Sequence, residues 1–225
     1  MNQFWDKFAD LDAATCEAVA ARLAAGEHPP GVAASLAISP VGIVAAVARV
    51  GLGDDASLGP PLVRGRAVRP DLAAVLAHGP TLAELFPRSS RPARLALAAG
   101  LLQVLDSWDL SHHAAQEADD LGETATAAAW HMVAHRREPD FANARYWARR
   151  IPSSTIYVDL AARAEPLLPR PAAANEAIDR PDWGPQTLID RAGKARSGSA
   201  EATLVRRLQR LEMLVLLDHS AALQI

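Results

Sequence analysis

The sequence contains a single cysteine and no excess of basic residues. The first argues against a disulfide-stabilised secreted protein, and the second against a strongly basic protein that binds nucleic acid or anionic lipid. Cys16 has no second cysteine with which to form an internal disulfide, so the chain suits a reducing compartment. We therefore expect a cytoplasmic protein. The formal net charge at pH 7 is −3, so no overall basic field attracts nucleic acid or anionic lipid.

No targeting segment is expected, and familiar catalytic motifs are missing from the sequence. The amino terminus, MNQFWDKFADLD, mixes acids and aromatics, unlike a basic and then apolar signal peptide. The most apolar stretch, residues 32–48, contains Pro40 and Gly42 and barely reaches the length of a membrane-spanning helix, so no membrane span is expected. The chain has no Gly-rich phosphate loop, no dinucleotide fingerprint and no G-x-S-x-G elbow.

Abundant alanine and regularly spaced apolar residues predict an all-α protein. Half of the 225 residues are hydrophobic, which is enough for a sizeable core. We expect a small three-helix module over residues 1–52, a Gly- and Pro-rich linker over 53–70, and a helical bundle over 71–225. Its last helix is predicted over residues 200–223, where leucines recur at helical spacing.

The front module resembles a helix-turn-helix in the string GVAASLAISPVGIVAAVARVGL. A DNA-reading helix needs polar or basic side chains that reach base edges and phosphates. The second helix of this string, residues 40–50, is almost wholly apolar and has Arg49 as its single charge. We therefore interpret it as a buried packing helix, and a partner protein as a better candidate for this module than nucleic acid.

The central part of the chain is predicted to contain consecutive helices over residues 93–120, 123–137 and 141–150. Gly122 separates the first two, and Pro139 ends the second. A short extended piece is predicted at residues 151–158 because they are apolar and β-branched, and the proline-rich residues 165–185 are predicted to form an irregular loop.

Histidines and a carboxylate gather on one face of the predicted helix 123–137. Each helical residue turns about 100° from the last, so His131 and His135 lie one turn apart, and Glu138 falls within about 20° of His131. Imidazole and carboxylate groups are suitable ligands for zinc or iron. The pattern predicts part of a divalent-metal site.

The preceding helix supplies a further candidate ligand. If Leu121 and Gly122 form a tight antiparallel turn, His112 lies at the height of His131, because both are equally far from that turn. Asp109 precedes His112 by three residues and could orient its ring. The candidate metal ligands are His112, His131, His135 and Glu138, and the candidate catalytic residues are Glu138 and Asp109.

Arginines crowd the stretch WHMVAHRREPDFANARYWARR and allow two interpretations. In one, they hold a small anionic substrate by paired hydrogen bonds, and the candidate substrate-binding residues are Arg137, Asn143, Tyr146 and Arg149. In the other, the arginines pair with nearby acids and hold the helices together.

The same stretch resembles an uncharacterised family with the pattern W-H-x3-H-R-R-E-x-D-x2-N-A-x-Y-W, which is matched from Trp130 to Trp147. The similarity covers residues 95–150 and extends to 200–220, where Glu212 and Asp218 occur. The resemblance implies a functional site in this stretch, without a settled activity. The spacing of Asp140, Ala144 and Trp147 also loosely resembles a tetratricopeptide helix, although the repetition typical of such arrays is missing.

Two functions remain open at this point. One is a metal-binding protein that acts as a metal-dependent hydrolase or lyase on a small anionic substrate, with a metal-bound water as the reactive group. The other is a non-catalytic helical adaptor whose histidines and arginines form a buried polar network and whose residues 1–52 bind a partner protein.

Overall fold

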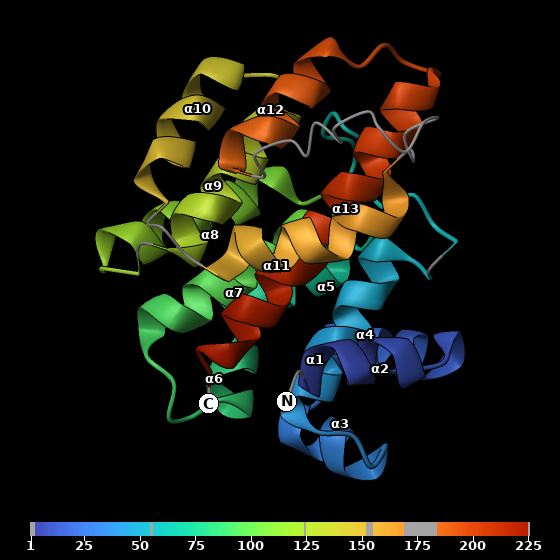
Figure 1. Cartoon of the computed structure of the whole chain (residues 1–225). Coiled ribbons are helices and arrows are strands. Elements are labelled where there is room, and N and C mark those ends of the chain that lie inside the picture. The colour runs from blue at the N-terminus through green and yellow to red at the C-terminus, as the bar shows by residue number, and fades with distance from the viewer. Residues whose placement is uncertain (1–2, 55, 124, 152–154, 169–183, 225) are drawn as a thin grey trace.

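The computed structural model of the chain describes residues 3–54, 56–123, 125–151, 155–168 and 184–224. Within these residues every regular element is a helix and no β-strand occurs, which confirms the predicted all-α bundle (Figure 1). Helices precede residue 53 as α1 (Gln3–Asp10), α2 (Ala13–Ala24), α3 (Pro29–Ser35) and α4 (Pro40–Leu52).

The amino-terminal region therefore has four helices instead of the expected three. The additional helix, α1, forms because its sequence buries Phe4 and Phe8 on one face. Helix α4 is capped by Ser39 and is buried continuously over residues 41–48, which confirms the prediction of a packing helix. No single described helix has both the length and the apolar composition to cross a bilayer; only α3 and α4 together meet that test, and they are bent by 93°.

Residues 53–69 contain no helix among those described, yet they are fixed to the bundle. Arg206, Gln209 and Arg210 of the last helix donate hydrogen bonds to backbone carbonyls of residues 52–61. The backbone N–H of Arg64 donates to the carbonyl of Arg137 at 2.8 Å. This segment, predicted as a linker, lies against the bundle and brings Arg64 beside its central helices.

The central helices are α5 (Pro70–His78), α6 (Thr81–Leu85), α7 (Arg91–Val104), α8 (Trp108–Asp120), α9 (Thr126–Arg137) and α10 (Phe141–Arg150). The predicted continuous helix over residues 93–120 is wrong, because it is broken between α7 and α8. At the break Asp106 has φ 58°, and its carboxylate accepts hydrogen bonds from Arg137 at 2.8 Å and from the N–H of Gly65 at 3.0 Å. Tertiary partners thus stabilise a backbone conformation that aspartate tolerates better than most residues do.

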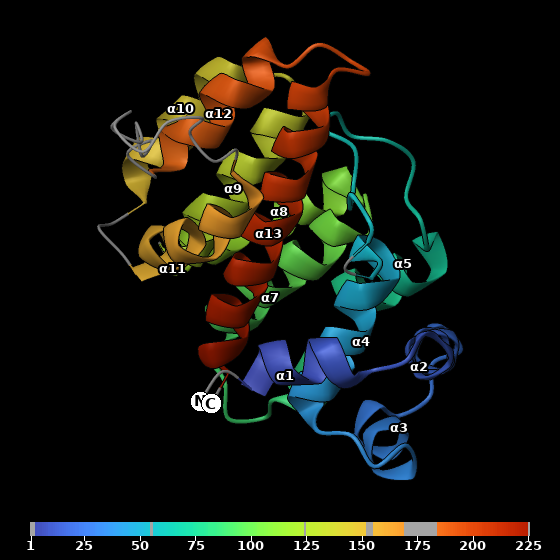
Figure 2. The same ribbon diagram turned by 45° about the vertical axis from the view of Figure 1, so that its right-hand side comes forward.

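The last elements are α11 (Thr155–Ala164), a short 3₁₀ helix (Glu165–Leu167), α12 (Pro185–Lys194) and α13 (Ala200–Ala222). The expected extended piece is wrong for residues 155–158, which begin α11, and residues 152–154 and 169–183 lie outside the described residues. Helix α13 confirms the predicted last helix and runs through the middle of the bundle (Figure 2).

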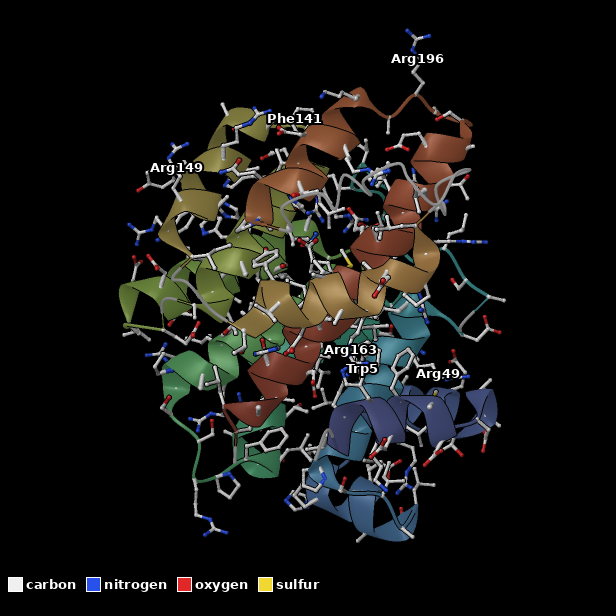
Figure 3. The ribbon with its side chains drawn as sticks, in the orientation of Figure 1. Trp5, Arg49, Phe141, Arg149, Arg163 and Arg196 are labelled. Carbon is white, nitrogen blue, oxygen red and sulfur yellow. The ribbon has the colours of Figure 1, made fainter. Side chains whose placement is uncertain are left out.

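One hydrophobic cluster extends from Phe4 in α1 to Leu217 in α13. Trp5 donates to the carboxylate of Asp218 at 3.1 Å, and the guanidinium of Arg163 lies 4.0 Å from the centre of the Trp5 ring (Figure 3). Among the described residues, helices α1 to α4 therefore share a hydrophobic core with the helices that follow residue 69.

Candidate metal centre

The centre is built by the helical hairpin of α8 and α9. Gly122 has φ +96° in the link between them, a conformation that glycine adopts without strain. The carboxylate of Glu123 accepts hydrogen bonds from backbone N–H groups of residues 125–127 and so caps the start of α9. The hairpin has the predicted register, since His112 and His131 face each other across it.

Three imidazole rings converge inside this hairpin. The Nε2 atom of His112 lies 2.8 Å from Nε2 of His131 and 3.3 Å from Nε2 of His135. One ring nitrogen from each residue lies within 4.8 Å of the other two. His131 and His135 are buried and His112 is partly buried, so the three ring nitrogens lie close together and are largely shielded from solvent.

Two tryptophans hold the imidazole rings in place. Trp108 stacks on His112 with ring centres 4.9 Å apart, and Trp147 of α10 stacks on His131 at 3.8 Å. The indole N–H of Trp108 donates to the carbonyl of Ala134 at 2.8 Å, which fixes that ring against α9. Flat rings packed in this way restrict the rotation of the imidazoles and leave their nitrogens directed at the centre.

Polar groups surround His135. Its Nδ1 atom lies 3.3 Å from the carboxylate of Glu138, and its Nε2 lies 3.1 Å from the amide nitrogen of Asn143. Arg64 lies 3.6 Å from the carboxylates of both Glu138 and Asp109 and 4.3 Å from the centre of the Trp108 ring. A chain of contacts thus runs from Arg64 through Glu138 to the imidazole of His135.

Burial favours the uncharged form of two of the imidazoles. Desolvation, followed by the neighbouring His112 and His135, lowers the pKa of His131 to about 3. Desolvation is also the largest cause that lowers the pKa of His112, ahead of the effect of His135. A neutral imidazole has a free lone pair on one nitrogen, and this is the form that binds a metal ion.

The structure places the other predicted site residues in different surroundings. Asn143 reaches His135, whereas the side chain of Asp109 is 92% exposed and contacts Arg64. Tyr146 and Arg149 are exposed on α10, and Figure 3 shows Arg149 pointing away from the bundle. Arg137 is fully buried, pairs with Asp106 and donates to the carbonyls of Pro61 and Gln103, so its guanidinium is already engaged.

Most of the nearby arginines pair with acids, as the second interpretation of the sequence expects. Arg136 forms a buried ion pair with Glu212 of α13 at 2.5 Å, and Arg137 forms one with Asp106 at 2.8 Å. The more exposed pairs are Arg145 with Asp190 and Arg150 with Asp119. These arginines join α9 and α10 to α8, α12, α13 and the link between α7 and α8.

Among the described residues, Arg64 is a polar contact of the centre that the sequence analysis did not place there. It precedes Asp109 by 45 positions and lies in a segment without helical spacing, so no periodic pattern connects it with the histidines. Its cluster with Arg66 and Arg69 was the only signal, and that cluster is equally typical of a solvated loop.

Comparison with known proteins adds no assignment: no family model, no curated protein and no solved structure matches the chain. The function must therefore be inferred from the geometry of the three histidines and their surroundings.

Proposed function

We propose that the chain is a cytoplasmic metal-binding protein in which His112, His131 and His135 bind one divalent ion, zinc or iron. The proposal depends on one observation, the convergence of three imidazole nitrogens from two helices. In a tetrahedral zinc site each nitrogen lies about 2.0–2.1 Å from the metal, which puts the nitrogens about 3.3 Å from one another. The distances of 2.8 and 3.3 Å from His112 to its two neighbours are close to that value.

The groups behind the histidines are suited to this role. With its proton on Nδ1, His135 donates a hydrogen bond to Glu138, and its Nε2 carries the lone pair that would bind the metal in place of the Asn143 amide, which lies 3.1 Å from it. Glu138 then orients a ligand and is not a ligand itself, in contrast to its predicted place in the metal shell. Arg64 in turn holds the carboxylate of Glu138.

One feature opposes metal binding and can be weighed. The Nδ1 atom of His131 is buried without a hydrogen-bond partner among the described residues. A metal at Nε2 would leave an unpaired N–H there, at a cost of about 1–3 kcal/mol. Structural zinc sites are bound with about 10–16 kcal/mol, so this cost is small by comparison.

A site with three histidines leaves a further coordination position, and this favours catalysis over a purely structural ion. A water molecule bound there would have a lowered pKa and could act as nucleophile or base. We therefore propose a metal-dependent hydrolase or lyase that acts on a small anionic substrate. From outside the hairpin, Asn143 contacts His135 and Arg64 contacts Glu138, and we assign substrate contacts to these two residues.

Elemental analysis of the full chain, purified without a histidine tag, tests the metal site. We expect near-stoichiometric zinc or iron in the wild type and loss of that metal in His131→Ala. His113→Ala is the matched control, because His113 is the exposed neighbour of His112, and it should retain the metal. A metal-free wild type that also fails to bind added zinc would reject the proposal and leave the non-catalytic adaptor as the better interpretation.

A further inference from the structure

Apart from the histidine centre, a hollow lies on another face of α8, between α5, α6, α7 and α8. Its cavity volume is about 240 Å³, and its apolar floor includes Leu76, Leu82, Ala98 and Ala114, which are nearly buried. His113 lines this hollow, whereas the preceding residue, His112, faces the other histidines. The two neighbouring histidines thus belong to two different sites.

Polar side chains stand around the apolar floor. Arg91 and Arg94 come from the first turn of α7, His78 from the end of α5, and His113 and Glu117 from α8. Arg91 forms an ion pair with Glu117, so one positive and one negative charge already neutralise each other at the hollow. The remaining formal charge belongs to Arg94.

Arg94 is partly buried and is fixed by one end of its guanidinium. Its Nη1 donates to the backbone carbonyls of Ser89 and Phe86. No partner among the described residues accepts from its Nε–H or from its second amino group. These two donors form the edge that binds a carboxylate through two parallel hydrogen bonds, and the anchored Nη1 reduces the entropy lost when they do so.

We infer that this hollow binds a small organic monocarboxylate with an apolar body. The carboxylate would bind Arg94, and the body would lie on the leucine and alanine side chains of the floor. Because Arg91 is already paired with Glu117, Arg94 offers one positive charge to a ligand, which favours a monoanion over a phosphate ester or a dicarboxylate. A cavity of about 150 Å³ in another protein holds benzene, so about 240 Å³ accommodates one ring with its carboxylate.

Calorimetric titration of the full chain with sodium benzoate, in the presence of a metal chelator, tests this site. We expect saturable binding of one benzoate per chain. Arg94→Gln should weaken it by about tenfold or more, since a charge-assisted hydrogen bond is lost. Ala98→Leu should weaken it by filling the floor, and His131→Ala should leave it unchanged.

Glu117→Gln keeps the proposal testable if Arg94→Gln fails to fold. This variant removes the facing negative charge and frees Arg91, so benzoate should bind more tightly than to the wild type. Absence of saturable binding to the wild type, or equal affinity in the wild type, Ala98→Leu and Glu117→Gln, would overturn the inference. Binding that disappears in His131→Ala would assign the benzoate to the histidines instead. The chelator makes these outcomes independent of whether the histidines hold a metal.

Discussion

At the scale of single residues, His135 shows how the outer contacts of the centre control its chemistry. Glu138 lies at Nδ1 of its ring while His112 and Asn143 lie at Nε2. The carboxylate can therefore determine which nitrogen carries the proton and which one is free to bind a metal.

Glu138→Gln should weaken zinc binding by about 10–100-fold, because the amide keeps the shape of the side chain but loses the charge that holds the Nδ1 proton. The measurement is a zinc titration against a competing chelator. Glu117→Gln is the control, since Glu117 lines the hollow between α5, α6, α7 and α8, where it pairs with Arg91 and not with a histidine of the centre. Equal zinc affinity of Glu138→Gln and the wild type would contradict this role.

The stability of the metal-free protein should fall as the pH drops below about 6.5. The pKa of His131 is lowered to about 3 in the folded chain, so between these values the unfolded chain binds a proton that the folded chain does not. The free energy of unfolding should decrease by up to about 1.4 kcal/mol per pH unit from this group.

Urea unfolding at several pH values between 7.5 and 4.5, with a chelator present, measures this dependence. His131→Gln lacks the group and should show a smaller slope, while the contributions of the other acids and histidines stay in both curves. Identical slopes for the two proteins would show that His131 titrates normally in the folded state.

Helical periodicity and the position of the turn were enough to predict the three histidines of the centre. His131 and His135 share a helix face, and the equal distance of His112 and His131 from the turn sets the height at which they meet. The same periodicity does not show which neighbours the side chains of the following residues contact. Glu138 contacts the Nδ1 atom of His135 and does not lie among the converging Nε2 atoms. Arg137, two residues after His135, forms a buried ion pair with Asp106.

At the scale of elements, the link between α8 and α9 determines which residues of the two helices lie opposite each other, and so brings His112 to His131. Gly122→Ala should lower the free energy of unfolding by about 1–2 kcal/mol, because φ +96° is unfavourable for a residue with a Cβ atom. The added methyl group meets no atom within 4 Å, so backbone strain is the cause of the loss.

Gly31→Ala is the matched control for this substitution. Gly31 lies in α3, and an added Cβ atom would be 3.7 Å from the nearest atom, which is an ordinary contact. Alanine is the better helix former by about 1 kcal/mol, so this variant should be as stable as the wild type or more so. Chemical denaturation measures both, and equal effects of the two substitutions would contradict the account of the turn.

The elements that sequence patterns predicted are those with strong local signals. Pro40 with Ser39 marks the start of α4, and leucine spacing marks α13. The break at Asp106 has no such signal, because the partners that hold it, Arg137 and Gly65, lie far away in the sequence. The β-branched residues at the start of α11 favour an extended segment, but the helix forms because its Ile156, Tyr157 and Leu160 side chains pack in the core.

At the scale of the whole molecule, α13 and the segment 53–69 connect the front helices with the centre. α13 donates to the carbonyls of residues 52–61, and the same segment presents Arg64 to Glu138. The buried pair of Arg136 and Glu212 joins α9 to α13. The histidine hairpin is therefore attached to the rest of the chain by Arg64 of the segment 53–69 and by Glu212 of α13.

X-ray absorption spectroscopy of the zinc-loaded full chain tests the metal centre most directly. The account predicts three nitrogen ligands with imidazole scattering at about 2.0–2.1 Å and one further light ligand, with one imidazole lost in His112→Ala and none in His113→Ala. A spectrum of hydrated zinc with oxygen ligands alone, or a spectrum that His112→Ala does not change, would contradict it.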